Sequence, residues 1–127
     1  MLFAVHALLA TLWGPAHAAE PTPRVSEATR GADPARGEQL YAANCTACHG
    51  AQADGRGPAA VALTPRPTDF TRAASWKGRS DTEMASLVRA GRPGTSMTAF
   101  PHLSEAEAAD IVAWLRTRVA APSAGEK

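Results

Sequence analysis

The sequence predicts an all-α domain in which three or more helices are joined by long irregular loops. Two Ser-x-x-Glu patterns, at Ser80 and Ser104, mark helix starts. Ten glycines and ten prolines, against three Phe, three Trp and one Tyr, are typical of helices separated by irregular chain and argue against an all-β fold. A chain of 127 residues has room for one domain.

The first 18 residues resemble a secretory signal. Met1 to Trp13 is an apolar run without a charged side chain, and Ala16-His17-Ala18 matches an A-x-A cleavage site. We expect cleavage after Ala18 and export to the periplasm as a soluble protein. The run is too short to span a bilayer comfortably, although a retained N-terminal anchor is the alternative.

The mature chain divides into a flexible segment (19–32), one domain (33–120) and a flexible tail (121–127). The first helix is predicted to start at Asp33-Pro34, because Asp33 can cap it and Pro34 needs no partner for a backbone N–H. It would run to the C-x-x-C-H motif at residues 45–49 and place Gly37, Tyr41, Cys45 and Cys48 near one face. A glycine and an aromatic residue one turn apart predict close approach of a second helix, and an ordinary amphipathic face is the alternative.

Residues 50–78 are predicted to form a long loop with a helical turn within 59–63. Such a loop is uncommon in a compact domain unless it wraps something. The Ser80 helix should place Met84, Leu87 and Val88 on one face and stop at Gly91.

The last helix should begin at Ser104 and end at Pro122, after a turn-rich loop over residues 92–101. Trp114 lies beside its apolar stripe. The stripe consists of Ala108, Ile111, Val112, Leu115 and Val119.

Cys45, Cys48 and His49 form a C-x-x-C-H motif, which is the signature of covalent c-type haem attachment. Two thiols three residues apart on a helical turn share a face and can add across two porphyrin vinyl groups. His49 then offers an imidazole nitrogen to the iron. The alternatives are a C-x-x-C redox pair and half a zinc site. These are the chain's only two cysteines, and beyond His49 its histidines are His6, His17 and His102.

Over residues 33–119 the chain resembles class I c-type cytochromes, specifically the small bacterial monohaem type. The resemblance rests on the early C-x-x-C-H motif, the irregular middle, the capped helices and the segment Met97-Thr98-Ala99-Phe100. In that family the distal iron ligand is the methionine of a Met-Pro-x-Phe loop, and threonine here replaces the proline. The resemblance implies the cytochrome c fold, one covalently bound haem c, and His49 and Met97 as iron ligands.

The resemblance implies further roles with less direct support in the motifs. Gly37 and Tyr41 match the residues by which the family's first helix crosses its last, with Trp114 as the partner. Pro58 resembles the proline whose carbonyl accepts the second N–H of the haem histidine. Trp76 or Arg72 would contact a haem propionate, and simple packing is the alternative for Trp76.

His/Met ligation leaves no open iron position, so we expect a one-electron carrier rather than an enzyme. One alternative is a haem subunit of a periplasmic dehydrogenase or oxidase complex. Another is a haem-based ligand sensor or weak peroxidase in which a small ligand displaces Met97.

The formal net charge of +1, with 13 Lys and Arg scattered among 12 acids, excludes a polybasic nucleic-acid binder. Two propionates would bring the holoprotein to about 0 or −1, so strong electrostatic steering is not expected. We expect a monomer that docks transiently with a redox donor and acceptor. The docking patch would be small and mostly neutral, around the haem edge near Ala47, Ala51 and Thr98.

Overall fold

The computed structural model describes residues 31–120. It contains four α-helices and two 3-10 turns, and no β-strand occurs within residues 31–120. The predicted signal peptide (1–18), the tail (121–127) and nearly all of the segment 19–32 lie outside this range. No helix among the described residues is long and apolar enough to cross a membrane.

The first predicted helix is present but is divided in two. Helix α1 (Pro34–Asn44) begins as expected: the Asp33 carboxylate accepts from the N–H groups of Ala35 and Arg36, at 2.9 and 3.3 Å. The chain then breaks at Cys45, and helix α2 (Thr46–His49) follows.

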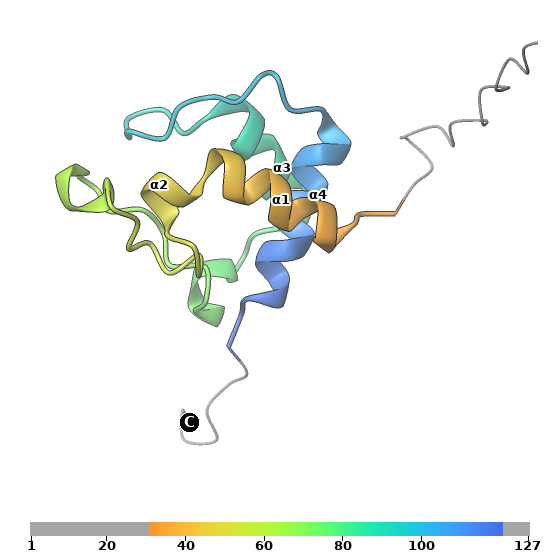
Figure 1. Ribbon diagram of the computed structural model, residues 1–127, viewed down its shortest axis with the longest axis horizontal. Coiled ribbons are helices and arrows are strands. Elements are labelled where there is room, and N and C mark those ends of the chain that lie inside the picture. Colours follow the sequence, from red (N-terminus) through yellow and green to blue (C-terminus); the bar gives the residue numbers. More distant parts are fainter. Residues whose placement is uncertain (1–30, 121–127) are drawn as a thin grey trace, which may run out of the picture.

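Helices α1 and α4 (Glu105–Thr117) form the centre of the domain, where they cross (Figure 1). A Cβ atom added to Gly37 would lie 1.9 Å from the Asp110 carbonyl oxygen, so only glycine permits this approach. One turn later the rings of Tyr41 and Trp114 pack with centroids 4.4 Å apart. The predicted close approach of a second helix is therefore confirmed.

Polar contacts also hold the crossing. Asp110 is fully buried, and its Oδ1 accepts from the backbone N–H of Asp33 at 2.7 Å. Arg36 lies 2.8 Å from Glu107 and 3.7 Å from Asp110. The start of α1 is thus fixed to the middle of α4 by charge-assisted bonds as well as by packing.

Helix α3 (Asp81–Ala90) packs on α4 and contributes Met84 and Val88 to the core. Both predicted capping boxes are present, at Ser80 for α3 and at Ser104 for α4. Helix α3 ends at Gly91, whose φ of 72° favours glycine.

Helix α4 ends at Thr117 rather than at Pro122. Beyond it the backbone N–H of Ala120 donates to the Thr71 carbonyl at 2.8 Å, so this group is committed to the long loop instead of a further helical turn. The loop contains the 3-10 turns η2 (Ala60–Ala62) and η3 (Ala73–Trp76), and the first of these confirms the predicted helical turn. The segments 50–78 and 92–103 both extend to one side of the α1/α4 crossing (Figure 1).

Candidate haem-binding site

The attachment motif occupies one tight turn. The N–H groups of Cys48 and His49 both donate to the Cys45 carbonyl, at 3.3 and 2.9 Å. Gly50 then reverses the chain with a φ of 79°, where an added Cβ would meet the Asp54 carboxylate at 2.5 Å. Upstream, the buried Tyr41 hydroxyl donates to the Gly50 carbonyl at 2.7 Å. The position of the turn is therefore set by α1.

Cys45, Cys48 and His49 line one cavity, together with residues from the loop 63–70, helix α3, the loop 92–100 and helix α4. Both thiols are free and half-buried. Much of the wall is apolar. Its apolar members include Leu63, Phe70, Leu87, Val88, Phe100, Ile111, Val112 and Leu115. Two adjacent thiols and an imidazole facing an apolar cavity are the groups that a covalently bound porphyrin requires.

Burial shapes the chemistry of these groups. It raises the pKa of Cys45 to about 11, with a smaller contribution from Cys48, so this thiol is protonated at neutral pH in the absence of haem. Burial lowers the pKa of His49, and the Thr68 backbone opposes this shift. The imidazole is therefore held neutral, which is the form that binds a metal.

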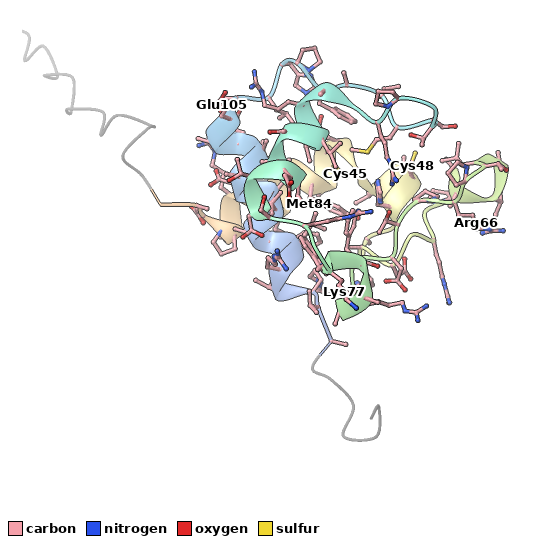
Figure 2. All side chains as sticks on the ribbon, turned by 180° about the vertical axis from the view of Figure 1, so that it is seen from behind. Cys45, Cys48, Arg66, Lys77, Met84 and Glu105 are labelled. Atoms are coloured by element: carbon pink, nitrogen blue, oxygen red, sulfur yellow. The ribbon has the colours of Figure 1, made fainter. Side chains whose placement is uncertain are left out.

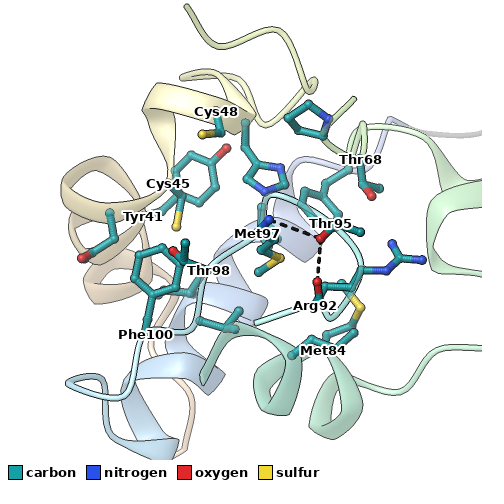
Figure 3. A pocket seen from close by; sticks show the side chains of 18 of the residues that line it. Tyr41, Cys45, Cys48, Thr68, Met84, Arg92, Thr95, Met97, Thr98 and Phe100 are labelled. Atoms are coloured by element: carbon teal, nitrogen blue, oxygen red, sulfur yellow. Dashed lines mark hydrogen bonds between the residues drawn. The ribbon is translucent and has the colours of Figure 1, made fainter. Parts of the chain in front are cut away.

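Met97 lines the same cavity from the loop between α3 and α4. The loop is held at its base, because the Arg92 N–H donates to the Met97 carbonyl at 3.1 Å and the Met97 N–H donates to the Thr95 hydroxyl at 3.2 Å. The Thr95 hydroxyl in turn donates to the Arg92 carbonyl at 2.7 Å. These bonds surround Met97 with a closed turn (Figure 3).

A second methionine, Met84, also lines the cavity. It is 5% exposed and belongs to the hydrophobic core, as predicted for its place on α3. Figure 3 shows that the two methionines come from different parts of the cavity wall, Met84 from helix α3 and Met97 from the loop that follows it. Two thioethers are thus available at the cavity.

A family model described as cytochrome c matches residues 34–118. The chain belongs to the cytochrome c family. This membership confirms the predicted fold class and the covalent haem c, which Cys45 and Cys48 of the C-x-x-C-H motif fit, and it supports a role in electron transport. It also excludes the two alternatives for this motif, a zinc site and a thiol redox pair.

No curated protein matches this cytochrome. Among solved structures, it is similar to a chain of the reducing HAO-like protein complex of Kuenenia stuttgartiensis, with 22% sequence identity and a TM-score of 0.59. The match covers 66% of this cytochrome and 41% of that chain. At this identity the likeness concerns the fold alone.

The predicted role of Pro58, whose carbonyl would accept the second N–H of the haem histidine, stays a prediction. Pro58 is exposed and does not line the cavity, and its neighbours Gly57 and Ala59 bond to the carbonyls of Cys48 and Ala47, at 3.1 and 2.9 Å. Thr68 lines the cavity, and its backbone opposes the lowering of the His49 pKa by burial. Nδ1 of His49 is buried and forms no standard hydrogen bond within residues 31–120.

Trp76 and Arg72 do not reach the cavity either. The Trp76 indole N–H donates to the Phe70 carbonyl at 2.9 Å, and Arg116 lies over its ring at 3.9 Å. Trp76 is therefore a packing residue between the long loop and α4, in line with the alternative considered from the sequence. Arg72 is exposed.

Three other arginines line the cavity: Arg66, Arg79 and Arg92. Within the described residues no acid lines it, and none of these arginines forms an ion pair. Sequence reasoning missed them, although an imbalance was visible: from Arg56 to Arg79 the chain carries five cations and one acid. A cavity with three unpaired cations is suited to a ligand that carries carboxylates.

Proposed function

We propose that this cytochrome is a periplasmic one-electron carrier whose haem iron is ligated by His49 and Met97. The observation that carries the proposal is that both side chains line the cavity that both cysteine thiols line. Bound haem c supplies a one-electron Fe(III)/Fe(II) couple, and ligation by His and Met leaves no open position for a substrate.

The chain's own groups support each part of this role. Burial keeps His49 neutral, so its lone pair is available to iron. The closed turn around Met97 limits the conformations of the loop, so less entropy is lost when the thioether is held at a metal. The apolar wall excludes water, which favours the less charged ferrous state.

Two variants separate the roles of the two methionines. Met97→Ala should keep its haem through Cys45 and Cys48 but lose the weak sulfur-to-iron absorption band of the ferric protein. It should also fall in reduction potential and bind carbon monoxide readily when ferrous. Met84→Leu should keep the band and lose at most about 1.5 kcal/mol of stability, the usual cost of a volume-conserving swap.

Absorption spectra of both ferric variants, recorded beside the parent protein, decide the assignment. Loss of the band in Met84→Leu and its retention in Met97→Ala would reverse the ligand roles. Rapid and complete binding of carbon monoxide by the parent protein would instead favour a ligand sensor.

We further propose that Arg66, Arg79 and Arg92 hold the haem propionates. Arg79 is half-buried, whereas Arg66 and Arg92 are exposed and more strongly screened by solvent. A cation near the haem favours the ferrous state, so Arg79→Gln should lower the reduction potential more than Arg66→Gln or Arg92→Gln. Spectroelectrochemistry measures this, with Arg72→Gln as the control that leaves the cavity unchanged. An equal shift for Arg72→Gln and Arg79→Gln would show that only net charge matters.

We also propose that the protein is exported to the periplasm and that it is a monomer rather than a subunit of a stable complex. Cleavage after Ala18 would release the chain into the periplasm, and sequencing the N-terminus of the native protein tests it. A monomer with transient redox partners is expected to sediment as a single species of about 12 kDa when haem-loaded. Co-purification with a stable dehydrogenase or oxidase would show that it is a complex subunit.

A further inference from the structure

Val61 is the one large apolar side chain that is exposed within residues 31–120, with 78% of its surface accessible. It sits in the 3-10 turn η2, which packs on the attachment helix α2. Two backbone bonds hold this turn: Ala59 N–H to the Ala47 carbonyl and Gly57 N–H to the Cys48 carbonyl. Val61 is therefore held in a fixed position at the surface. Because the side chain is exposed, it contributes little hydrophobic stabilisation to the fold.

The surroundings of Val61 are uncharged and small. We define the Val61 face as the exposed residues Ala47, Pro58, Ala59, Val61 and Ala62. Arg56 and Arg66 bracket this stretch of chain, and both are exposed. Neither forms an ion pair within the described residues. Figure 2 shows Arg66 on the side of the domain that carries Cys48, at the opposite end from Glu105.

The Val61 face is continuous with the cavity wall. Leu63 and Pro65 lie two and four residues after Val61 in the chain and both line the cavity, as does Cys48 beneath the turn. A protein seated on the face would therefore be separated from the cavity by few side chains.

We propose that the Val61 face is the docking surface for an electron-transfer protein with an apolar centre and carboxylates at its rim. This inference rests on the proposed carrier function. An exposed apolar residue that is flanked in the chain by two exposed arginines, Arg56 and Arg66, matches a small interface with an apolar core and a polar rim. Arginine pairs well with carboxylates, which sets the sign of the partner's charge.

A second copy of this chain and a membrane surface are both less suited to the Val61 face. A second copy of this chain, related by a two-fold axis, would bring Arg56 and Arg66 against the same cations. A membrane surface would require a larger apolar area, because one valine among alanines and prolines contributes little to insertion.

The test measures the rate of electron transfer to a defined probe. The probe is a type 1 copper protein of higher potential whose copper lies beneath an apolar face edged by carboxylates, compared with the same protein after its rim carboxylates are converted to amides. One electron passes from the ferrous cytochrome to copper(II), which yields the ferric cytochrome and copper(I). Stopped-flow absorbance follows this reaction at low and high ionic strength.

Val61→Asp should lower the second-order rate constant at least tenfold at low ionic strength. Ala35→Asp, which adds the same charge at an exposed position in the first turn of α1, should change it less than twofold. Arg56→Gln should slow the reaction about threefold with the acidic probe and leave the amidated probe unaffected.

The absorption spectrum should stay unchanged in all three variants, and the reduction potential of each is measured so that a change in driving force is not taken for a change in docking. If the parent lacks the sulfur-to-iron band, the proposed ligation fails while the docking test remains valid. Equal effects of Val61→Asp and Ala35→Asp would overturn the docking surface. Self-association that Val61→Asp abolishes, or Val61-dependent binding to phosphatidylglycerol vesicles, would assign the face to a second copy or to a membrane and would also overturn the proposal.

Discussion

Replacement of Gly37 by alanine tests the crossing that organises the domain. The new methyl group would lie 1.9 Å from the Asp110 carbonyl oxygen and 2.4 Å from its carbon, whereas ordinary contact begins at 3.4 Å. Both neighbours are helix backbone, so no side-chain rotation relieves the clash. Helices α1 and α4 must separate by about 1.5 Å, the difference between contact and clash.

The energetic cost follows from what this separation disturbs. Overpacking costs about 1–3 kcal/mol, and the bond from the Asp33 N–H to the buried Asp110 carboxylate is of the charged type, whose loss costs about 1.5–3 kcal/mol. Alanine recovers about 1 kcal/mol through its higher helix propensity. The expected net loss for Gly37→Ala is about 3 kcal/mol.

Urea denaturation of the haem-loaded protein, followed by circular dichroism, measures this loss. With a slope of about 1.5 kcal/mol per molar urea, the midpoint should fall by about 2 M. Gly31→Ala is the matched control, because nothing lies within 4 Å of its added Cβ. A change below about 0.5 kcal/mol for Gly37→Ala would refute the view that this contact fixes the crossing.

Two further predictions concern polar contacts. Tyr41→Phe removes the buried bond to the Gly50 carbonyl and should cost about 0.5–1.5 kcal/mol in the same urea assay, the usual net value of one hydrogen bond, since the carbonyl still accepts from the Ala53 N–H at 3.1 Å. Glu107 has a lowered pKa, first through the Ser104 backbone N–H and then through the Ser104 hydroxyl and Arg36. Its stabilisation is present above the unfolded pKa of about 4.3 and is lost as pH falls through the folded value. The stability difference between the parent and Glu107→Gln should therefore be constant from pH 6 to 8 and shrink below about pH 4, and a difference that grows on acidification would contradict the assignment.

Helix starts were predictable because capping is local. Asp33, Ser80 and Ser104 each satisfy N–H groups within three residues, so four-residue patterns contain the necessary information. The haem-attachment motif and Met97 are equally local signals, and family membership confirms the covalent haem that the motif predicted.

The helix ends were less predictable because side chains and distant segments decide them. At Cys45, the Asn44 amide donates to the Leu40 carbonyl at 2.8 Å and the Thr46 hydroxyl donates to the Ala42 carbonyl at 3.0 Å. Such bonds compete with continued helix, which divides α1 from α2. At the other end, the contact between Ala120 and Thr71 joins residues that are far apart in sequence.

The cavity wall was the least predictable part, for the same reason. Whether Pro58 or Thr68 reaches His49 depends on the path of a long loop, and its course is set by the bonds of Gly57 and Ala59 to α2. Pro58 is exposed in this loop, and Thr68, ten residues later, lines the cavity. A motif that places a proline at the usual distance from the histidine does not contain this information.

The two sides of the site are held by different kinds of structure, so substitutions on each side should have different effects. The His49 side depends on the α1/α4 crossing through Tyr41, whose ring packs on Trp114 and whose hydroxyl bonds to Gly50. The Met97 side depends on a turn closed mainly by its own backbone and the Thr95 hydroxyl. Substitutions in the loop should therefore change ligation and potential with little effect on the fold, because they leave the crossing intact. Substitutions at the crossing should act on stability first, since the attachment turn cannot move without the helix that holds it.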